Sequence, residues 1–461
     1  MTKQIRFNAF SMNCVGHISS GVWRIPGDTT HRYTDLEFWI DFAKTLERGL
    51  FDGLFIADVI GLYDVYGGNG DQAYRSAAQI PVNDPLQIVP AMAAFTKHLG
   101  FGVTSSVAFE HPFPFARRMT TLDHLTKGRA GWNIVTSYLD SGARNLGAAR
   151  LLDHDNRYDV ADEYLDVVYK LWEGSWEDDA VIRDAVHNIY TDPSKVHEIH
   201  HEGRFFKVPG AHVSEPSPQR TPVLYQAGAS SRGRDFAAKH AESSFLAAPS
   251  KKLTKEYVAD LRRRAVAAGR RAEDILTFAQ FTLVLGETDA EAQKKLDHYK
   301  QYVDREGALA LMSGWTGVDL SKLDWDKPID DLDGNAIQFT AKAFSSADPD
   351  KVWTVREIAE YAGIGGDGPV IVGSPATVAD ALQEWQAETG LDGFNLAAIT
   401  HPGTFRDVVD LLVPELQRRG AYKRNYTDGA LRHKLFGEGP RLPARHYGAS
   451  HRNLARVKEL A

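Results

Sequence analysis

The sequence has very little cysteine, since Cys14 is the only one among 461 residues. A single cysteine cannot form a disulfide within the chain, which excludes a disulfide-stapled scaffold and is typical of a reducing compartment. Apolar runs are short, and none approaches the roughly 18 residues that a membrane-spanning helix needs. The first residues, MTKQIRFNAF, lack the apolar core of a signal peptide. These features predict a cytoplasmic protein without a membrane partner.

Positive charge is also in deficit. The 53 lysines and arginines stand against 61 aspartates and glutamates, which gives a net charge of −8. Binding to nucleic acid requires a basic face, so we expect no nucleic-acid partner. Hydrophobic residues make up 43% of the chain and charged residues 25%, which is ordinary for a globular protein with a large core. The length suits two or three average domains, or one α/β barrel with insertions.

Short apolar segments alternate with amphipathic helical segments along most of the chain. There are eight such strand–helix pairs, the number that closes a parallel barrel. The predicted strands are residues 5–10, 52–58, 101–107, 130–137, 222–228, 243–248, 275–286 and 392–398. We predict an α/β fold, a (β/α)8 TIM barrel over 1–420, with insertions near 175–221 and 306–390. Residues 421–461 are predicted to form an arm over the surface or over a partner subunit. An open doubly wound sheet is the competing architecture.

Three motif matches have surroundings that do not suit their chemistry. H-E-x-x-H occurs at 197–201, but the residues after it alternate like a hairpin, whereas zinc binding needs both histidines on one helix face. G-x-G-x-x-G occurs at 363–368, where a helix-like segment precedes and a strand-like segment follows, the reverse of a dinucleotide site. A G-x-S-x-G elbow fails because Arg232 stands where the last glycine is required. We therefore expect neither a metal ion nor a serine nucleophile.

Polar residues gather where the predicted strands end, which is the reactive face of a parallel barrel. Each has an ordinary structural explanation, such as a cap or a loop residue, but together they indicate a site. They are Asn13, Cys14, His17, Asp58, Thr104, Ser105, Ser106, Thr136, Ser137, Tyr138, Gly228, Ser230 and Ser231.

The segment QAGASSRGRDF favours a phosphate site, because Ser230 and Ser231 stand at the start of a predicted helix and backbone N–H groups there bind anions. Other polar residues nearby are Arg232, Arg234, His154, Arg157 and Tyr158. Hydroxyl and aromatic walls around a phosphate site suggest FMN.

Long segments resemble the nitrilotriacetate/dibenzothiophene-sulfone monooxygenase group of bacterial-luciferase-like, FMNH2-dependent monooxygenases. Within that group the chain is most similar to the branches that act on dimethyl sulfide and on long-chain alkanes. The segments are FNAFSMNCVGH, DGLFIADVIGLYDVYGG, QIPVNDP, EHPFPFARRMTTLDHLTKGRAGWNIVTSYL, DHDNRYDVADEYLDVVYKLWEGSWEDDAVIRD and EPSPQRTPVLYQAGASSRGRDFAAKHAE. The resemblance covers nearly the whole chain and implies a luciferase-type barrel.

The resemblance also implies a two-component reaction. A separate NAD(P)H:FMN reductase supplies FMNH2, O2 adds to form a flavin C4a-hydroperoxide, and one oxygen atom passes to the substrate. It implies a homodimer or a higher homo-oligomer. The residues that match FMN contacts of the family are Asp58, Thr104, Ser137, His154, Tyr158 and Ser230. Those that match its substrate pocket are Cys14, His17, Tyr63 and Gln79.

Two departures from the alkane branch bear on the substrate. Tyr138 and Leu311 stand where the alkane enzyme has histidines. They favour a small organosulfur or apolar substrate of the dimethyl sulfide type over a long alkane. Long-chain alkane oxidation, a flavin- or F420-dependent dehydrogenase on the same barrel, and a non-catalytic flavin-binding protein are the alternatives.

Cys14 and His17 lie three residues apart and could form half a metal site, a nucleophile with its base, or part of a pocket wall. We interpret them as a pocket wall. Cys14 is predicted to keep an ordinary pKa near ~8.5 and to remain a thiol, because His17 is the only candidate cation beside it. The imidazole of His17 is the better candidate for a hydrogen bond to the hydroperoxide.

Overall fold

The computed structural model describes residues 3–247, 249–328 and 352–453. Eight parallel strands form a closed barrel in which each strand pairs with the next and the last pairs with the first. In order around the barrel they are β1 (Arg6–Met12), β2 (Gly53–Ala57), β3 (Gly100–Ser106), β4 (Ala130–Val135), β9 (Val223–Gln226), β10 (Ser243–Leu246), β11 (Leu276–Leu285) and β13 (Gly393–Ala397). Each overlaps one predicted strand, so the predicted TIM barrel is confirmed and the open sheet is excluded.

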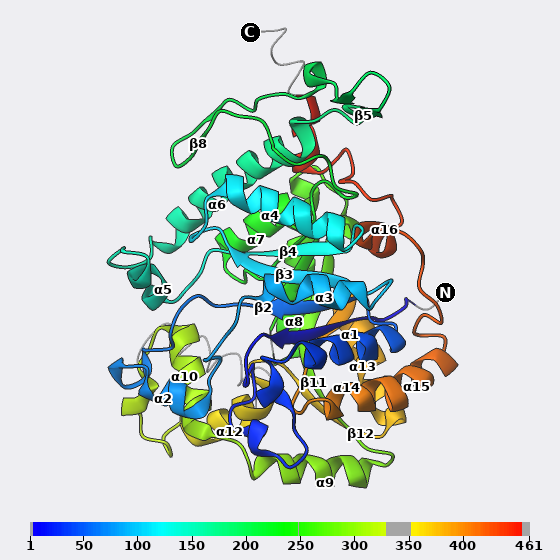
Figure 1. Cartoon of the computed structure of the whole chain (residues 1–461). Coiled ribbons are helices and arrows are strands. Elements are labelled where there is room, and N and C mark those ends of the chain that lie inside the picture. Colours follow the sequence, from blue (N-terminus) through cyan, green and yellow to red (C-terminus); the bar gives the residue numbers. More distant parts are fainter. Residues whose placement is uncertain (1–2, 248, 329–351, 454–461) are drawn as a thin grey trace.

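Amphipathic helices surround the barrel (Figure 1). In α1, for example, Trp39, Phe42, Ala43 and Leu46 recur at helical spacing and are buried. A hydrophobic stripe of this kind packs a helix against the strands. The larger helices of the outer layer are α1 (Leu36–Arg48), α4 (Pro112–Leu125), α6 (His154–Tyr169), α7 (Ser231–His240), α8 (Lys251–Ala267), α9 (Asp289–Lys300) and α13 (Pro375–Thr389). Shorter ones are α3 (Val89–Ala94), α14 (Gly403–Asp407) and α15 (Val413–Arg418). Among the described residues, no helix is long and apolar enough to cross a membrane.

Two segments interrupt the strand–helix alternation. The first carries the hairpins β5 (Val181–Asp184)–β6 (Ile189–Thr191) and β7 (His201–Glu202)–β8 (Lys207–Val208). The second begins with α10 (Arg305–Thr316), which packs on α2 (Asp71–Ser76) and α12 (Val355–Gly365) near the carboxyl ends of the strands (Figure 1). It also contains β12 (Val370–Gly373), which pairs with the end of β11 outside the barrel.

The structure explains why the motif matches fail. The H-E-x-x-H histidines do not share a helix face, because 197–200 is not helical and His201 begins β7. His197 contacts Glu177 at 2.9 Å, whereas His201 contacts Glu163 at 3.2 Å. The G-x-G-x-x-G match covers the last turn of α12 and the turn before β12, so a helix precedes it and a strand follows, as predicted.

The arm closes the amino-terminal end of the barrel. Tyr422 is fully buried with its ring 5.1 Å from that of Phe7 on β1. Arg432, on α16 (Leu431–Phe436), donates to both carboxylate oxygens of Glu242, at 2.6 and 2.8 Å. Leu431 lies so close to Gly100 that a Cβ there would come within 2.5 Å of it, so this packing requires a glycine at the start of β3. Tyr422, Leu431 and Arg432 of the arm therefore belong to the packing of the barrel, and its residues 454–461 lie outside the described residues.

Candidate active site

The carboxyl ends of β2 and β3 open into a cavity of about 570 Å³. Its walls include the predicted residues Asp58, Thr104, Ser105 and Ser106. A second cavity of about 240 Å³ shares Phe109 with the first and reaches Thr136 and Arg157. The two cavities together run from the strand ends toward the start of α6. A parallel barrel places its reactive groups at this end.

Hydroxyl groups from neighbouring strands are fixed in place by hydrogen bonds. Thr104 is buried and accepts a hydrogen bond from the Nδ2 of Asn133 at 2.9 Å. The hydroxyls of Ser106 and Ser137 lie 2.8 Å apart. Ser137 has φ of +63°, a left-handed conformation that is uncommon for a non-glycine residue and clusters at functional sites.

Asp58 follows the end of β2, and its environment disfavours the charged form. Burial, followed by the negative charge of Asp84, raises the pKa of Asp58 from 3.8 to about 7. A raised pKa of this size marks candidate functional residues. The carboxyl therefore changes its charge near neutral pH, inside the cavity.

We expect Asp58→Asn to stabilise the fold at neutral pH but not in acid. The folded chain holds the proton up to about pH 7, whereas an ordinary aspartate loses it near 3.8. The free energy of unfolding of the wild type therefore falls as the pH rises through that interval. Each pKa unit corresponds to ~1.4 kcal/mol, so the total loss is at most about 4 kcal/mol. Thermal unfolding at a series of pH values measures the difference. The exposed Asp41 on α1 is the control, and Asp41→Asn should give a pH-independent shift. If the difference in stability between Asp58→Asn and the wild type were the same at every pH, it would contradict the raised pKa of Asp58.

The predicted phosphate residues meet at the start of α7. Ser230 caps this helix, and its Oγ accepts from the N–H of Gly233 at 3.0 Å. A hydrogen bond links Tyr158 to Ser230. The ring of His154 lies 5.2 Å from that of Tyr158, and His154 also contacts Asp155 at 2.7 Å. Three residues predicted as cofactor contacts thus lie together, although Ser230 is 72 positions beyond Tyr158 in the chain.

The arginines near this helix start divide into two groups. Arg232 pairs with Asp159 and Asp162, and Arg234 pairs with Asp260, so both are already neutralised. Arg157 instead has no carboxylate partner within the described part of the chain. Its Nη1 donates to the carbonyl oxygen of Leu152 at 2.7 Å, and its Nε is buried without a hydrogen-bond partner. A buried donor without a partner is costly unless a ligand satisfies it. Arg157, beside Tyr158, is therefore the arginine available to an anion.

Cys14 and His17 line a small cavity of about 30 Å³ after β1. Burial and the charge of Asp58 raise the pKa of the Cys14 thiol above its ordinary value. The prediction of an ordinary pKa for Cys14 is therefore wrong. A raised pKa still keeps Cys14 in the protonated thiol form, as predicted. Burial and the nearby His401 lower the pKa of His17 to about 3, against a hydrogen bond with the backbone of Phe10. His17 is thus a neutral imidazole at physiological pH.

Tyr63 is the centre of a hydrogen-bond network in which Tyr63 and Gln79 are buried and Tyr138 is 44% exposed. Its hydroxyl donates to Oε1 of Gln79 at 2.7 Å and lies in hydrogen-bond contact with the hydroxyl of Tyr138. Gln79 in turn donates to the backbone carbonyl of His17 at 2.6 Å, which connects this network to the small cavity. Burial raises the pKa of Tyr138 to about 12, so its phenol stays protonated. Three predicted pocket residues, His17, Tyr63 and Gln79, are therefore joined with Tyr138 in one hydrogen-bond network.

Sequence reasoning missed one member of this hydrogen-bond network. The indole N–H of Trp315 donates to the hydroxyl of Tyr63 at 3.3 Å. Trp315 lies on α10, within a predicted insertion, and its segment shows only a helical pattern, so no local signal marks it. Leu311 on the same helix is buried against Tyr63 and Leu139 in an apolar cluster.

The fold is thus a closed parallel barrel, with hydroxyl, phenol and imidazole groups gathered at the carboxyl ends of its strands. A family model described as luciferase-like monooxygenase matches residues 17–393. The chain belongs to the luciferase-like monooxygenase family, and it is an enzyme of that class.

Individual relatives support this assignment. The chain is 50% identical over 460 residues to dimethyl-sulfide monooxygenase of Hyphomicrobium sulfonivorans, covering 100% of this chain and 96% of the relative. It is 52% identical over 457 residues to long-chain alkane monooxygenase of Geobacillus thermodenitrificans, covering 99% of each. The crystal structure of DmoA from Hyphomicrobium sulfonivorans superposes with a TM-score of 0.94 at 50% identity, over 98% of this chain and 96% of that one. A structure of riboflavin lyase with modified FMN and riboflavin superposes with a TM-score of 0.89 at 37% identity, over 98% of this chain and 100% of that one.

Proposed function

We propose that this chain binds reduced FMN, supplied by a separate NAD(P)H:FMN reductase, and transfers one oxygen atom of O2 to a small organosulfur or apolar substrate of the dimethyl sulfide type. The observation that carries the proposal is the hydrogen bond between Tyr158 and Ser230, which brings the start of α6, with Arg157, next to the start of α7. Arg157 lines the cavity of about 240 Å³, which adjoins the hydroxyl-lined cavity at Phe109. We further propose a homodimer; the oligomer and the reductase both rest on the family resemblance.

The residues present suit FMN. Ser230, Tyr158 and His154 would hold the phosphate together with the backbone N–H groups of α7. Thr104, Ser137 and Asp58 would lie along the remainder of the cofactor. The side-chain oxygens of Asn13, Asn133 and Gln226 are buried and lack hydrogen-bond partners among the described residues. Such acceptors match the N–H groups of a reduced flavin ring.

Reduced flavin, when bound, supplies the electrons that activate O2, so the protein has to bind, orient and exclude water. His17 is neutral, and its imidazole can hold or donate a hydrogen bond to a reacting oxygen atom without itself changing charge. Gln79 fixes the backbone of His17 and the hydroxyl of Tyr63 at once. Cys14, a buried thiol, contributes volume and an apolar wall.

Oxygen uptake distinguishes the candidate functions. The chain is mixed with FMN, NADH and a generic flavin reductase, and O2 consumption and product are followed with and without dimethyl sulfide. A monooxygenase consumes O2 with formation of oxidised substrate. A dehydrogenase on the same barrel reduces or oxidises its substrate without O2, and a flavin-binding protein without activity gives no turnover beyond that of the reductase.

We expect Ser230→Ala to weaken the binding of reduced FMN by roughly ten- to a hundred-fold, because a hydrogen bond to a charged group contributes about 1.5–3 kcal/mol. Anaerobic titration followed by fluorescence or calorimetry measures the affinity. Ser231→Ala is the matched control, since the Oγ of Ser231 accepts from Arg264 at 3.2 Å instead. Unchanged affinity in Ser230→Ala would show that the phosphate binds elsewhere.

A further inference from the structure

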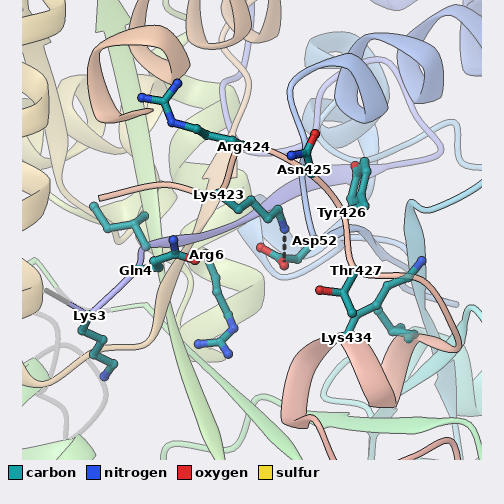
Figure 2. A pocket seen from close by; sticks show the side chains of 12 residues that line it. Lys3, Gln4, Arg6, Asp52, Lys423, Arg424, Asn425, Tyr426, Thr427 and Lys434 are labelled. Atoms are coloured by element: carbon teal, nitrogen blue, oxygen red, sulfur yellow. Dashed lines mark hydrogen bonds and ion pairs between the residues drawn. The ribbon is translucent and has the colours of Figure 1, made fainter. Parts of the chain in front are cut away.

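Another cavity, here called the basic cavity, lies at the opposite end of the barrel from the candidate active site. Its volume is about 550 Å³, and it lies between the first residues of the chain, Asp52 and the arm (Figure 2). Arg6 begins β1 and Asp52 precedes β2, whereas Cys14 and Asp58 follow the carboxyl ends of the same two strands. The length of the strands therefore separates the two sites.

Positive charge dominates this cavity. Five of the residues that line it are cations, and Asp52 is the only carboxylate among them. The cations are Lys3, Arg6, Lys423, Arg424 and Lys434. Lys423 pairs with Asp52, as Figure 2 shows, and Lys3 pairs with Asp392 at 2.7 Å. An excess of cations is notable in a chain whose net charge is −8.

Three of the cations have no carboxylate partner within the described ranges. Their hydrogen bonds go to backbone carbonyl oxygens, so their positive charge is not neutralised. Arg6 donates to Leu435 at 3.0 Å, Arg424 to Gln417 at 2.8 Å, and Lys434 to His98 at 2.8 Å. Cations that outnumber the carboxylates lining the same cavity repel one another, and an anion that binds there offsets this repulsion.

Tyr426 holds part of this group in place. Its ring stacks on the imidazole of His98, with centroids 4.8 Å apart and planes at 13°. The ammonium groups of Lys423 and Lys434 lie 5.3 and 5.7 Å from the centroid of the same ring. Its hydroxyl donates to the carbonyl of Phe51 at 2.8 Å. The positive groups are thus positioned before any ligand arrives, which reduces the entropy lost on binding.

The titration of Lys434 agrees with this geometry. Burial and the positive charges of Arg129 and Lys423 lower its pKa to about 8, and the acidic groups that face it, Glu47 and Asp428, do not offset them. The ammonium form is therefore disfavoured in the absence of an anion.

We propose that the basic cavity binds a small phosphate-bearing anion. Its volume falls within the ~300–1,000 Å³ of ordinary ligand sites. A guanidinium such as that of Arg6 matches two phosphate oxygens at once, and a lysine adds a point charge. The site does not depend on the flavin chemistry proposed above.

Calorimetric titration of the full chain with inorganic pyrophosphate tests the proposal. Saturable binding is expected, and Arg6→Met and Lys434→Met should each weaken it by roughly tenfold. Lys207→Met, which removes an exposed charge on β8, should leave the affinity unchanged. Above pH 8 the bound anion raises the pKa of Lys434, so binding takes up protons from the buffer, and Lys434→Met should abolish this uptake. Lys434→Arg should retain binding if the variants fold, which thermal unfolding checks.

Two results would overturn the proposal. One is the absence of saturable binding at millimolar pyrophosphate. The other is binding that Ser230→Ala removes and Arg6→Met does not, which would place the anion at α7 instead. Titration with ADP distinguishes the sources of the phosphate. If ADP binds more tightly than pyrophosphate, the natural ligand is a nucleotide. If the two bind equally, it is an inorganic anion.

Discussion

His17→Ala is expected to lose at least about a hundred-fold in kcat, whereas Cys14→Ala should stay within a few-fold of the wild type. Removal of one positioned hydrogen-bond donor to a reacting oxygen atom typically costs ~10²–10³ in kcat. Burial keeps the imidazole of His17 neutral and ready to hydrogen-bond, but it also keeps Cys14 in the unreactive thiol form. Steady-state oxygen uptake with dimethyl sulfide and saturating reduced FMN measures both variants.

The pH profile gives an independent check on His17. Because its pKa is about 3, kcat of the wild type should show no transition due to this imidazole above about pH 5. His17→Gln retains a hydrogen-bonding side chain and should recover part of the rate. An inactive Cys14→Ala variant with intact flavin binding would instead support a nucleophilic role for the thiol.

Oxygen uptake coupled to dimethyl sulfide, with little on hexadecane, is the second large effect that we expect. The cavity at Cys14 and His17 has a volume of about 30 Å³. By the same measure a single water molecule needs ~10–15 Å³, so this cavity is small. The hydroxyls of Tyr138 and Tyr63 are in contact, and Leu311 is packed with Tyr63 in an apolar cluster. A missing or additional methylene changes binding by only ~1–3 kcal/mol, so long chains have to be rejected by steric closure.

Substitutions at Tyr138 separate size from hydrogen bonding. Tyr138→Ala should raise kcat/KM for larger sulfides by roughly tenfold. This is the lower end of the change in kcat/KM that one methylene group in an apolar pocket causes, about 10–200-fold. Tyr138→Phe retains the ring but loses the contact with the hydroxyl of Tyr63, and it should keep the preference for small sulfides. Efficient hydroxylation of long alkanes by the wild type, with small sulfides untouched, would contradict this substrate and favour the long-chain alkane activity.

Local sequence patterns were sufficient to predict the barrel. Each strand is an apolar run bounded by polar residues, and each outer helix repeats its apolar residues at helical spacing, so both elements are specified by neighbours along the chain. Asp58, Thr104 and Ser137 could be placed on the reactive rim for the same reason, because each directly follows or ends a predicted strand. The assignment of individual roles still came from the family resemblance.

Long-range contacts could not be predicted in this way. The contact between Tyr63 and Tyr138 joins residues 75 positions apart, and the indole of Trp315 reaches Tyr63 from 252 positions away. The basic cavity likewise exists only where the arm returns to the first strand. Periodicity within a segment carries no information about which segments meet.

The sequence by itself determined the barrel, the rim and the family to which the chain belongs. Only the tertiary structure decided the charge states of the rim, because the raised pKa of Asp58 and the lowered pKa of His17 arise from burial by distant segments. It also decided which arginine is neutralised, since Arg232 pairs with carboxylates about 70 residues earlier in the chain, whereas Arg157 has no carboxylate partner among the described residues. Electrostatics depends on distance in space, and a linear sequence does not contain that distance.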